Sequence, residues 1–268
     1  MPTKKITAVA LFLIVFALTV PVIAQSAWTV TKTIKIGGEG GWDYLTVDPQ
    51  THRLYVPRST HTMVIDSDSG QTIADIPGQK RAHGVAIVSK AGRGFISDGG
   101  GDGAVVIFDL KSSAVLGTIA TQPDTDGIIF DQSSGRVLSV SGDGGTLMTF
   151  KPEIDPKTGK MEAPIELGGK PEFLAADGKG KAYINLVDKN EVVVVDLDAR
   201  KVTARWSVAP GGAPVGMSMD VKKRLLFVGS VNFGCYRHKL AMRVPLVHMT
   251  TSGVAPRRQR LVDAGQPS

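Results

Sequence analysis

Cysteine is almost absent from this sequence, and tryptophan is scarce. The single cysteine, Cys235, excludes an intramolecular disulfide and any cysteine-based zinc or iron–sulfur scaffold. The three tryptophans are too few to stack a quinone cofactor, which argues against a quinone-dependent oxidoreductase. A packed core must therefore stabilise the chain, and its 42% hydrophobic and 21% charged residues are ordinary proportions for one.

The body of the chain also lacks the positive charge that the total suggests. The net charge is +6, but residues 1–24 hold two lysines and no acid, and residues 231–268 hold six basic residues against one aspartate. The segment between them is nearly neutral. This is not the distributed cationic face that binds phosphate groups, which argues against nucleic acid as a partner.

The first 24 residues have the pattern of a secretory signal peptide. Lys4 and Lys5 precede an apolar run from Ile6 to Val20, and small residues stand before Gln25. An uncleaved membrane anchor is the alternative, but about 15 apolar residues fall short of the roughly 20 that span a bilayer. We therefore predict a periplasmic or secreted protein with no stable membrane span after cleavage.

A pattern of about 43 residues repeats along the mature chain. Five segments align on residues 48, 88, 131, 177 and 220, which are 40, 43, 46 and 43 residues apart. A second half of each unit keeps the same phase, since Asp66 and Asp109 are 43 residues apart. The repeats predict structural units at residues 42–84, 85–127, 128–172 and 173–216, with a partial unit at 217–229.

Each unit contains four short β-branched runs separated by turn signals. In the second unit these runs are 85–88, 94–97, 104–108 and 115–119. They are too short for normal helices, and four strands in 40–50 residues is typical of a propeller blade. We predict an all-β fold, a β-propeller of four-stranded blades. A long β-sandwich is the alternative, but it does not explain the period.

The third unit carries an insertion. Residues 151–160 contain two prolines and no apolar run, so we predict an exposed loop.

Three stretches give the sequence a family resemblance. They are Gly40–Pro49, Gly168–Phe173, and Asp177–Lys181 running on to Glu191–Asp196. In these stretches, within residues 29–228, the chain resembles the YncE-like (YVTN-repeat) β-propeller family of bacterial exported proteins. The resemblance implies a seven-bladed ring and a binding or scaffold role. It implies no catalytic residues.

The repeat stops abruptly after residue 229. About four and a half blades are encoded, and residues 230–268 are basic and unlike a blade. We interpret this segment as an aberrant tail produced by a reading-frame change or a broken gene model, so that the propeller is truncated. The alternative is a genuine basic tail for an acidic surface.

One candidate site follows from the repeat. The residue before the first strand of each unit should lie at one mouth of the central channel. Carboxylates and an imidazole at this position would suit a divalent cation such as calcium, or acid–base chemistry. The alternative is a hydrated polar rim without a ligand. The candidate residues are Asp43, His83, Asp126 and Glu172, with Val215 in the fifth unit.

These observations favour a non-enzymatic exported module whose propeller face binds an unknown protein or small molecule. The alternative is a metal-dependent lactonase-type hydrolase that uses the acidic and histidine ring. Beyond a divalent cation, the sequence indicates no cofactor.

Overall fold

A computed structural model describes residues 30–231 of the chain, together with the backbone of residues 234–239 and 247–249. The predicted signal peptide and most of the predicted aberrant tail lie outside the described residues. Contacts divide the chain into residues 1–35 and residues 36–268, and the strands among the described residues all belong to the second of these units.

The first two four-stranded units share one long strand. Thr72–Ile76 of this strand pairs within the first unit, and Val85–Val88 pairs within the second, so the two form a single seven-stranded sheet. A short 3-10 helix, η1 (Ser89–Ala91), follows the shared strand. The strands are β1 (Thr46–Asp48), β2 (Arg53–Pro57), β3 (Ser59–Asp66), β4 (Thr72–Val88), β5 (Arg93–Asp98), β6 (Ala104–Asp109) and β7 (Val115–Ala120).

Three further four-stranded antiparallel sheets follow in chain order. The third unit consists of β8 (Thr125–Asp131), β9 (Arg136–Ser141), β10 (Thr146–Phe150) and β11 (Ile165–Glu166). The fourth consists of β12 (Pro171–Ala176), β13 (Lys181–Leu186), β14 (Glu191–Asp196) and β15 (Lys201–Ser207). The fifth consists of β16 (Pro214–Asp220), β17 (Leu225–Ser230), β18 (Gly234–Lys239) and β19 (Val247–Met249).

The predicted all-β fold of four-stranded blades is confirmed. In the second unit, each predicted run falls inside an observed strand. Hydrogen-bonded aspartates form the turns between β3 and β4 and between β6 and β7. The Asp66 carboxylate accepts hydrogen bonds from the backbone and hydroxyl of Ser69, and Asp109 does the same with Ser112. The repeated aspartate is therefore a turn residue.

Pairing in the last sheet continues past residue 229, where the blade-like sequence stops. The backbone of β18 pairs with β17 from Leu225 to Ser230, and β19 pairs with β18. The fifth unit thus has four paired strands, where the sequence indicated a partial blade. The origin of residues 230–268 in a reading-frame change stays a prediction.

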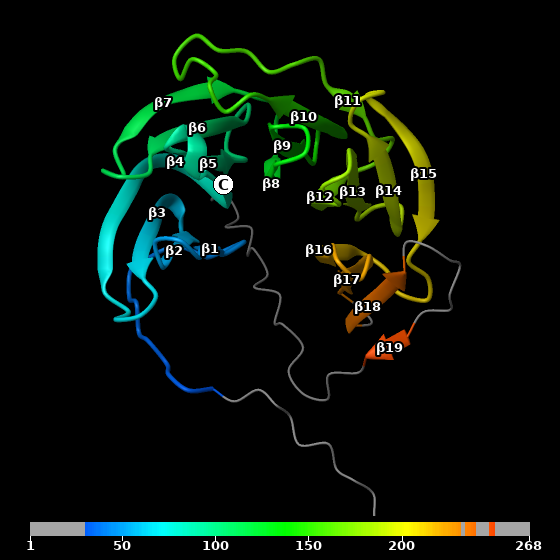
Figure 1. Cartoon of the computed structure of the whole chain (residues 1–268), viewed down its shortest axis with the longest axis horizontal. Coiled ribbons are helices and arrows are strands. Elements are labelled where there is room, and N and C mark those ends of the chain that lie inside the picture. Colours follow the sequence, from blue (N-terminus) through cyan, green and yellow to red (C-terminus); the bar gives the residue numbers. More distant parts are fainter. Residues whose placement is uncertain (1–29, 232–233, 240–246, 250–268) are drawn as a thin grey trace, which may run out of the picture. The chain divides into compact units, whose positions relative to one another are not determined.

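Adjacent units pack face to face because side chains alternate along each strand. Phe95 of β5 joins a buried cluster with Phe150 of the third unit, whereas Ile96 joins one with Tyr55 of the first. The first strands of successive units contact one another in order, β4 with β8, β8 with β12, and β12 with β16. In Figure 1, β8, β12 and β16 lie on the inside and β7, β11 and β15 on the outside.

The insertion at residues 151–160 is partly packed rather than freely solvated. Pro152 is buried, and Ile154 lies against the cluster between the second and third units. Arg93 donates to the carbonyl oxygens of both residues, at 3.1 Å and 2.8 Å. These contacts could not be predicted from the sequence, because one isoleucine among polar residues forms no recognisable pattern.

The described residues of the chain include no helix that is long and apolar enough to cross a membrane.

Packing between the first two units predicts the effect of adding one methyl group. A Cβ on Gly94 would overlap the ring of Phe108, which is fully buried beside Tyr55. We expect Gly94→Ala to lower the free energy of unfolding by about 1–3 kcal/mol. Gly216→Ala is the matched control, because a Cβ there meets no atom within 4 Å. Urea unfolding of both variants tests the prediction, and equal midpoints would contradict this packing.

Candidate functional site

The register of four inner strands shifts at the predicted site residues. In β4 the regular pairing skips from Ala82 to Val85, which leaves His83 out of register. Such bulges redirect a side chain away from the regular alternation of the sheet. The same shift occurs in β8 (Thr125 to Ile128), β12 (Pro171 to Leu174) and β16 (Pro214 to Met217).

Glycine follows the site residue in three of these strands. A Cβ on Gly127 would lie 2.9 Å from the carbonyl oxygen of Glu172, so glycine allows β8 to approach β12 closely. A Cβ on Gly84 would likewise lie 3.2 Å from Cγ2 of Ile128 in β8. The repeated glycine is a sequence signal for the bulge, and it places equivalent residues of neighbouring units side by side.

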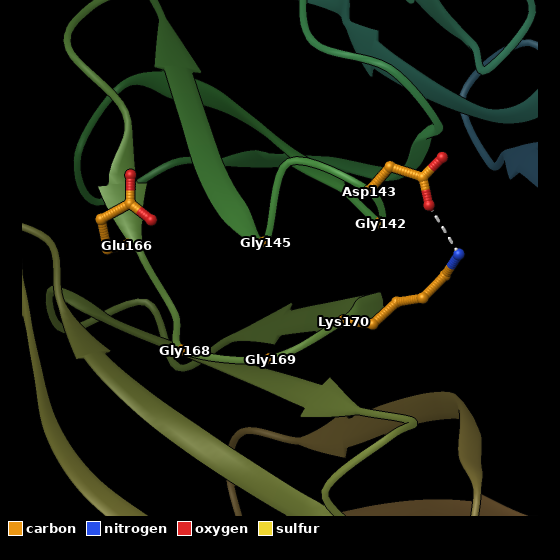
Figure 2. A pocket seen from close by; sticks show the side chains of 7 residues that line it. All are labelled: Gly142, Asp143, Gly145, Glu166, Gly168, Gly169 and Lys170. Atoms are coloured by element: carbon orange, nitrogen blue, oxygen red, sulfur yellow. Dashed lines mark hydrogen bonds and ion pairs between the residues drawn. The ribbon is translucent and has the colours of Figure 1, made fainter.

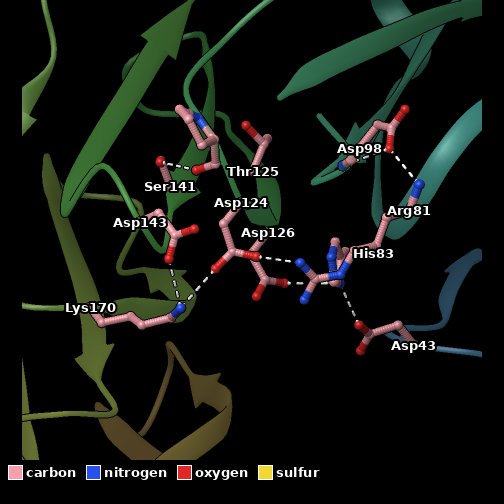
Figure 3. A network of polar contacts seen from close by, with 12 residues as sticks. Asp43, Arg81, His83, Asp98, Asp124, Thr125, Asp126, Ser141, Asp143 and Lys170 are labelled. Atoms are coloured by element: carbon pink, nitrogen blue, oxygen red, sulfur yellow. Dashed lines mark hydrogen bonds and ion pairs between the residues drawn. The ribbon is translucent and has the colours of Figure 1, made fainter. Parts of the chain in front are cut away.

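Three of the four predicted site residues meet. We call Asp43, His83 and Asp126 the His83 cluster. The Nδ1 atom of His83 lies 2.6 Å from Oδ2 of Asp43 and 3.5 Å from Oδ1 of Asp126. One ligand atom from each residue lies within 4.8 Å of the others. Figure 3 shows the three side chains converging from separate elements.

The fourth predicted residue, Glu172, contributes no atom to this group. It lies half-buried in β12, where burial raises its pKa and the charges of Asp43 and Asp124 raise it further. Beside it, the ring of Phe173 stacks against Tyr44, which precedes β1, with ring centroids 4.2 Å apart. This aromatic contact joins the segment before β1 to the fourth unit.

Burial shapes the electrostatics of the His83 cluster. Asp126 is 5% exposed, and this burial raises its pKa to about 8, although the nearby His83 opposes the shift. Burial lowers the pKa of His83, but the hydrogen bond with Asp43 and the charge of Asp126 outweigh it, so that the net shift is upward. Burial and the neighbouring carboxylates therefore disfavour a second negative charge in the cluster unless a cation is bound there.

Two polar atoms of the cluster are buried without a hydrogen-bond partner among the described residues. They are Nε2 of His83 and Oδ1 of Asp126. Nε2 faces the backbone of Gly99, where a Cβ would lie 2.9 Å away. Nδ1 is therefore the ring nitrogen that faces the two carboxylates.

Arg58 positions Asp43 by holding the segment before it. The guanidinium group is buried and donates to the carbonyl oxygens of Gly37, Gly38 and Gly40, at 2.8 Å, 2.9 Å and 3.0 Å. Gly40 has φ +84°, and a Cβ there would lie 2.6 Å from the Arg58 carbonyl oxygen. The glycine at position 40 therefore lets the backbone before Asp43 lie against the backbone of Arg58, where a side chain would clash.

A second set of charges lies two residues before the site positions. We call Arg81, Asp124 and Lys170 the ion ladder. Asp124 lies 2.8 Å from Arg81 Nη1 and 3.1 Å from Lys170 Nζ, and Lys170 also pairs with Asp143 at 2.9 Å. Burial raises the pKa of Asp124, but the two cations lower it overall. The ladder joins the second, third and fourth units (Figure 3).

Sequence reasoning missed the ion ladder, although the repeat contained its signal. Each member stands two residues before a predicted site residue, and the charges alternate in sign from unit to unit. Only the packing of neighbouring units shows that these charges pair.

A shallow groove lies beside the ladder (Figure 2). It has a volume of about 440 Å³ and lies between the β9–β10 turn and the segment before β12. Its only cation, Lys170, already pairs with Asp124 and Asp143, so the groove offers an anion no unpaired charge. The lining residues are Gly142, Asp143, Gly145, Glu166, Gly168, Gly169 and Lys170.

The ladder predicts unequal effects of removing the two carboxylates that pair with its cations. Asp124 is buried and bonds two cations, so Asp124→Asn should lower the free energy of unfolding by about 1–2 kcal/mol. Asp143 is 62% exposed, and Asp143→Asn should cost less than about 0.5 kcal/mol. Urea unfolding at low salt measures both variants. Equal losses would contradict a structural role for the ladder.

Comparison with known proteins supports the fold. No protein-family model and no curated protein matches the sequence. The structure is similar to the β-propeller domain of Myceliophteria thermophila Cps50 (Swd1), with a TM-score of 0.66 and 10% identity over 81% of this chain and 70% of that one. It is also similar to Kuenenia stuttgartiensis hydrazine synthase, with a TM-score of 0.58 and 11% identity over 78% and 80% of the two chains.

At these identities the likeness concerns the fold alone. Together with the four-stranded sheets, it establishes that the chain has a β-propeller fold. The resemblance to the YncE-like family stays a prediction.

Proposed function

We propose that the protein is an exported β-propeller binding module of the YncE-like type, which takes a positively charged ligand at the His83 cluster. The observation that carries the proposal is the convergence of Asp43, His83 and Asp126 from three separate elements. Two of these side chains are more than nine-tenths buried. Buried titratable groups with incomplete pairing are typical of functional sites, because they do not favour folding.

The charge balance favours a cationic ligand. The ladder cations Arg81 and Lys170 are both engaged by Asp124. The carboxylates of Asp43 and Asp126 are left with a single imidazole between them. A cation at this point would complete the pairing that buried charges require.

The position of His83 favours binding over acid–base hydrolysis. Its Nδ1 atom is engaged by Asp43, and its Nε2 atom lies against the backbone of Gly99. A general base needs a nitrogen within hydrogen-bond reach of its substrate. Neither ring nitrogen has this placement, so the lactonase-type alternative has less support than a binding role.

Export is part of the same proposal. It is supported by the basic start, apolar run and small-residue exit of residues 1–24. A propeller face is a common surface for protein recognition, so the module's partner is either a small cation or a cationic group of a protein.

The proposal predicts that Asp126 does not stabilise the free protein. We expect Asp126→Asn, in chelator-treated protein, to leave the unfolding midpoint unchanged or to stabilise the fold by up to about 2 kcal/mol, because it replaces a carboxyl whose ionisation is disfavoured by burial and keeps the Asp43–His83 pair. Thermal and urea unfolding measure this change.

Asp98→Asn is the matched control. The Asp98 carboxylate accepts backbone hydrogen bonds from Lys80, Arg81 and Gly100, so its neutralisation should cost about 1.5–3 kcal/mol. If Asp126→Asn destabilises the protein as much as Asp98→Asn does, the cluster is a structural element and the binding proposal fails.

A further inference from the structure

We infer that Asp43, His83 and Asp126 form a binding site for a divalent transition-metal cation, with Nδ1 of His83 and one oxygen of each carboxylate as ligands. This inference rests on the proposed function, because it names the cation that the cluster would take. The sequence indicated a divalent cation such as calcium, and the inference narrows this to a transition metal.

The distances suit a small metal ion. Ligand atoms that lie about 2.1 Å from a tetrahedral metal are about 3.4 Å from one another. Nδ1 of His83 and Oδ1 of Asp126 are 3.5 Å apart. Nδ1 and Oδ2 of Asp43 are 2.6 Å apart, so this pair would open by about 0.8 Å when a metal replaces the bridging proton.

Asp43 is the ligand that would have to move, and it is the least constrained of the three. The Asp43 side chain is 38% exposed, and the residue stands in a segment before β1 rather than in a strand. His83 and Asp126 lie in β4 and β8, packed between neighbouring units. Two fixed ligands and one adjustable ligand can therefore accommodate the ion without displacing a blade.

Asp126 provides independent support for a ligand at this point. It is 5% exposed, and its Oδ1 atom has no hydrogen-bond partner among the described residues. Oδ1 points toward Nδ1 of His83 (Figure 3). A buried carboxylate oxygen without a donor costs free energy, and a metal ion on that side would satisfy it.

The donor set selects among cations. Calcium and magnesium take oxygen ligands, and calcium needs six to eight of them. One imidazole nitrogen with two carboxylate oxygens suits divalent transition-metal ions such as Zn²⁺ and Mn²⁺, which accept both nitrogen and oxygen ligands. Three protein ligands also leave at least one coordination position open to water or to a group of a bound partner.

Manganese binding to the metal-free full chain tests the inference. The free Mn²⁺ signal in electron paramagnetic resonance gives the dissociation constant and stoichiometry, and Zn²⁺ and Ca²⁺ are added as competitors. Mn²⁺ also avoids selective capture by the thiol of Cys235, since it prefers oxygen and nitrogen ligands. We expect one site per chain, from which Zn²⁺ but not equimolar Ca²⁺ displaces the manganese.

Variants locate the site. His83→Gln and Asp126→Asn should each weaken Mn²⁺ binding at least about 100-fold. His52→Gln is the matched control, because His52 also pairs with an aspartate, Asp68, at 2.7 Å, but on the exposed surface. It should leave binding unchanged. Unfolding curves recorded alongside show that each variant is folded.

Three outcomes would overturn the inference: no Mn²⁺ or Zn²⁺ binding, equal competition by Ca²⁺, or undiminished binding in folded Asp126→Asn protein. The proposed function fails separately. If metals do not bind but Asp126→Asn does not destabilise the protein, the cluster still qualifies as a site for a different cation. If Asp126→Asn is strongly destabilising, the binding role itself is wrong.

Discussion

The constraint on which the site depends is the register shift in the inner strands β4, β8, β12 and β16. At His83 and Asp126, pairing with the next strand is interrupted, and the side chain leaves the regular alternation of the sheet. The glycine that follows each of these residues lets the neighbouring unit approach closely. Because the shift recurs in every unit from the second to the fifth, equivalent positions from units about 43 residues apart become spatial neighbours.

Two layers of charge with opposite roles result from this repetition. In the ion ladder, Asp124 pairs with a cation from each neighbouring unit, and Asp143 also pairs with Lys170, so that two carboxylates balance the two cations. In the His83 cluster two residues further along the strands, one imidazole stands between two carboxylates, and the layer is not balanced. The ladder holds the units together, whereas the unbalanced layer is free to interact with a ligand.

The sequence predicted the parts of the fold that repetition makes visible. Short β-branched runs and turn aspartates recur in phase, so the strands of the second unit and the positions of Asp43, His83 and Asp126 could be foreseen. The separation of Glu172 could not, because it depends on the packing of one blade against the next. The packing of Ile154 in the insertion depends likewise on contacts between units that no local pattern encodes.

A double-mutant cycle between Asp43 and His83 tests most directly that the cluster forms. Their contact joins the segment held by Arg58 to the second unit, across 40 residues of sequence. The free energy of unfolding of metal-free Asp43→Asn, His83→Gln and the double variant gives the coupling energy. We expect a coupling energy of about 0.5–3 kcal/mol. A value within about 0.3 kcal/mol of zero would contradict it, because residues that do not meet have additive effects.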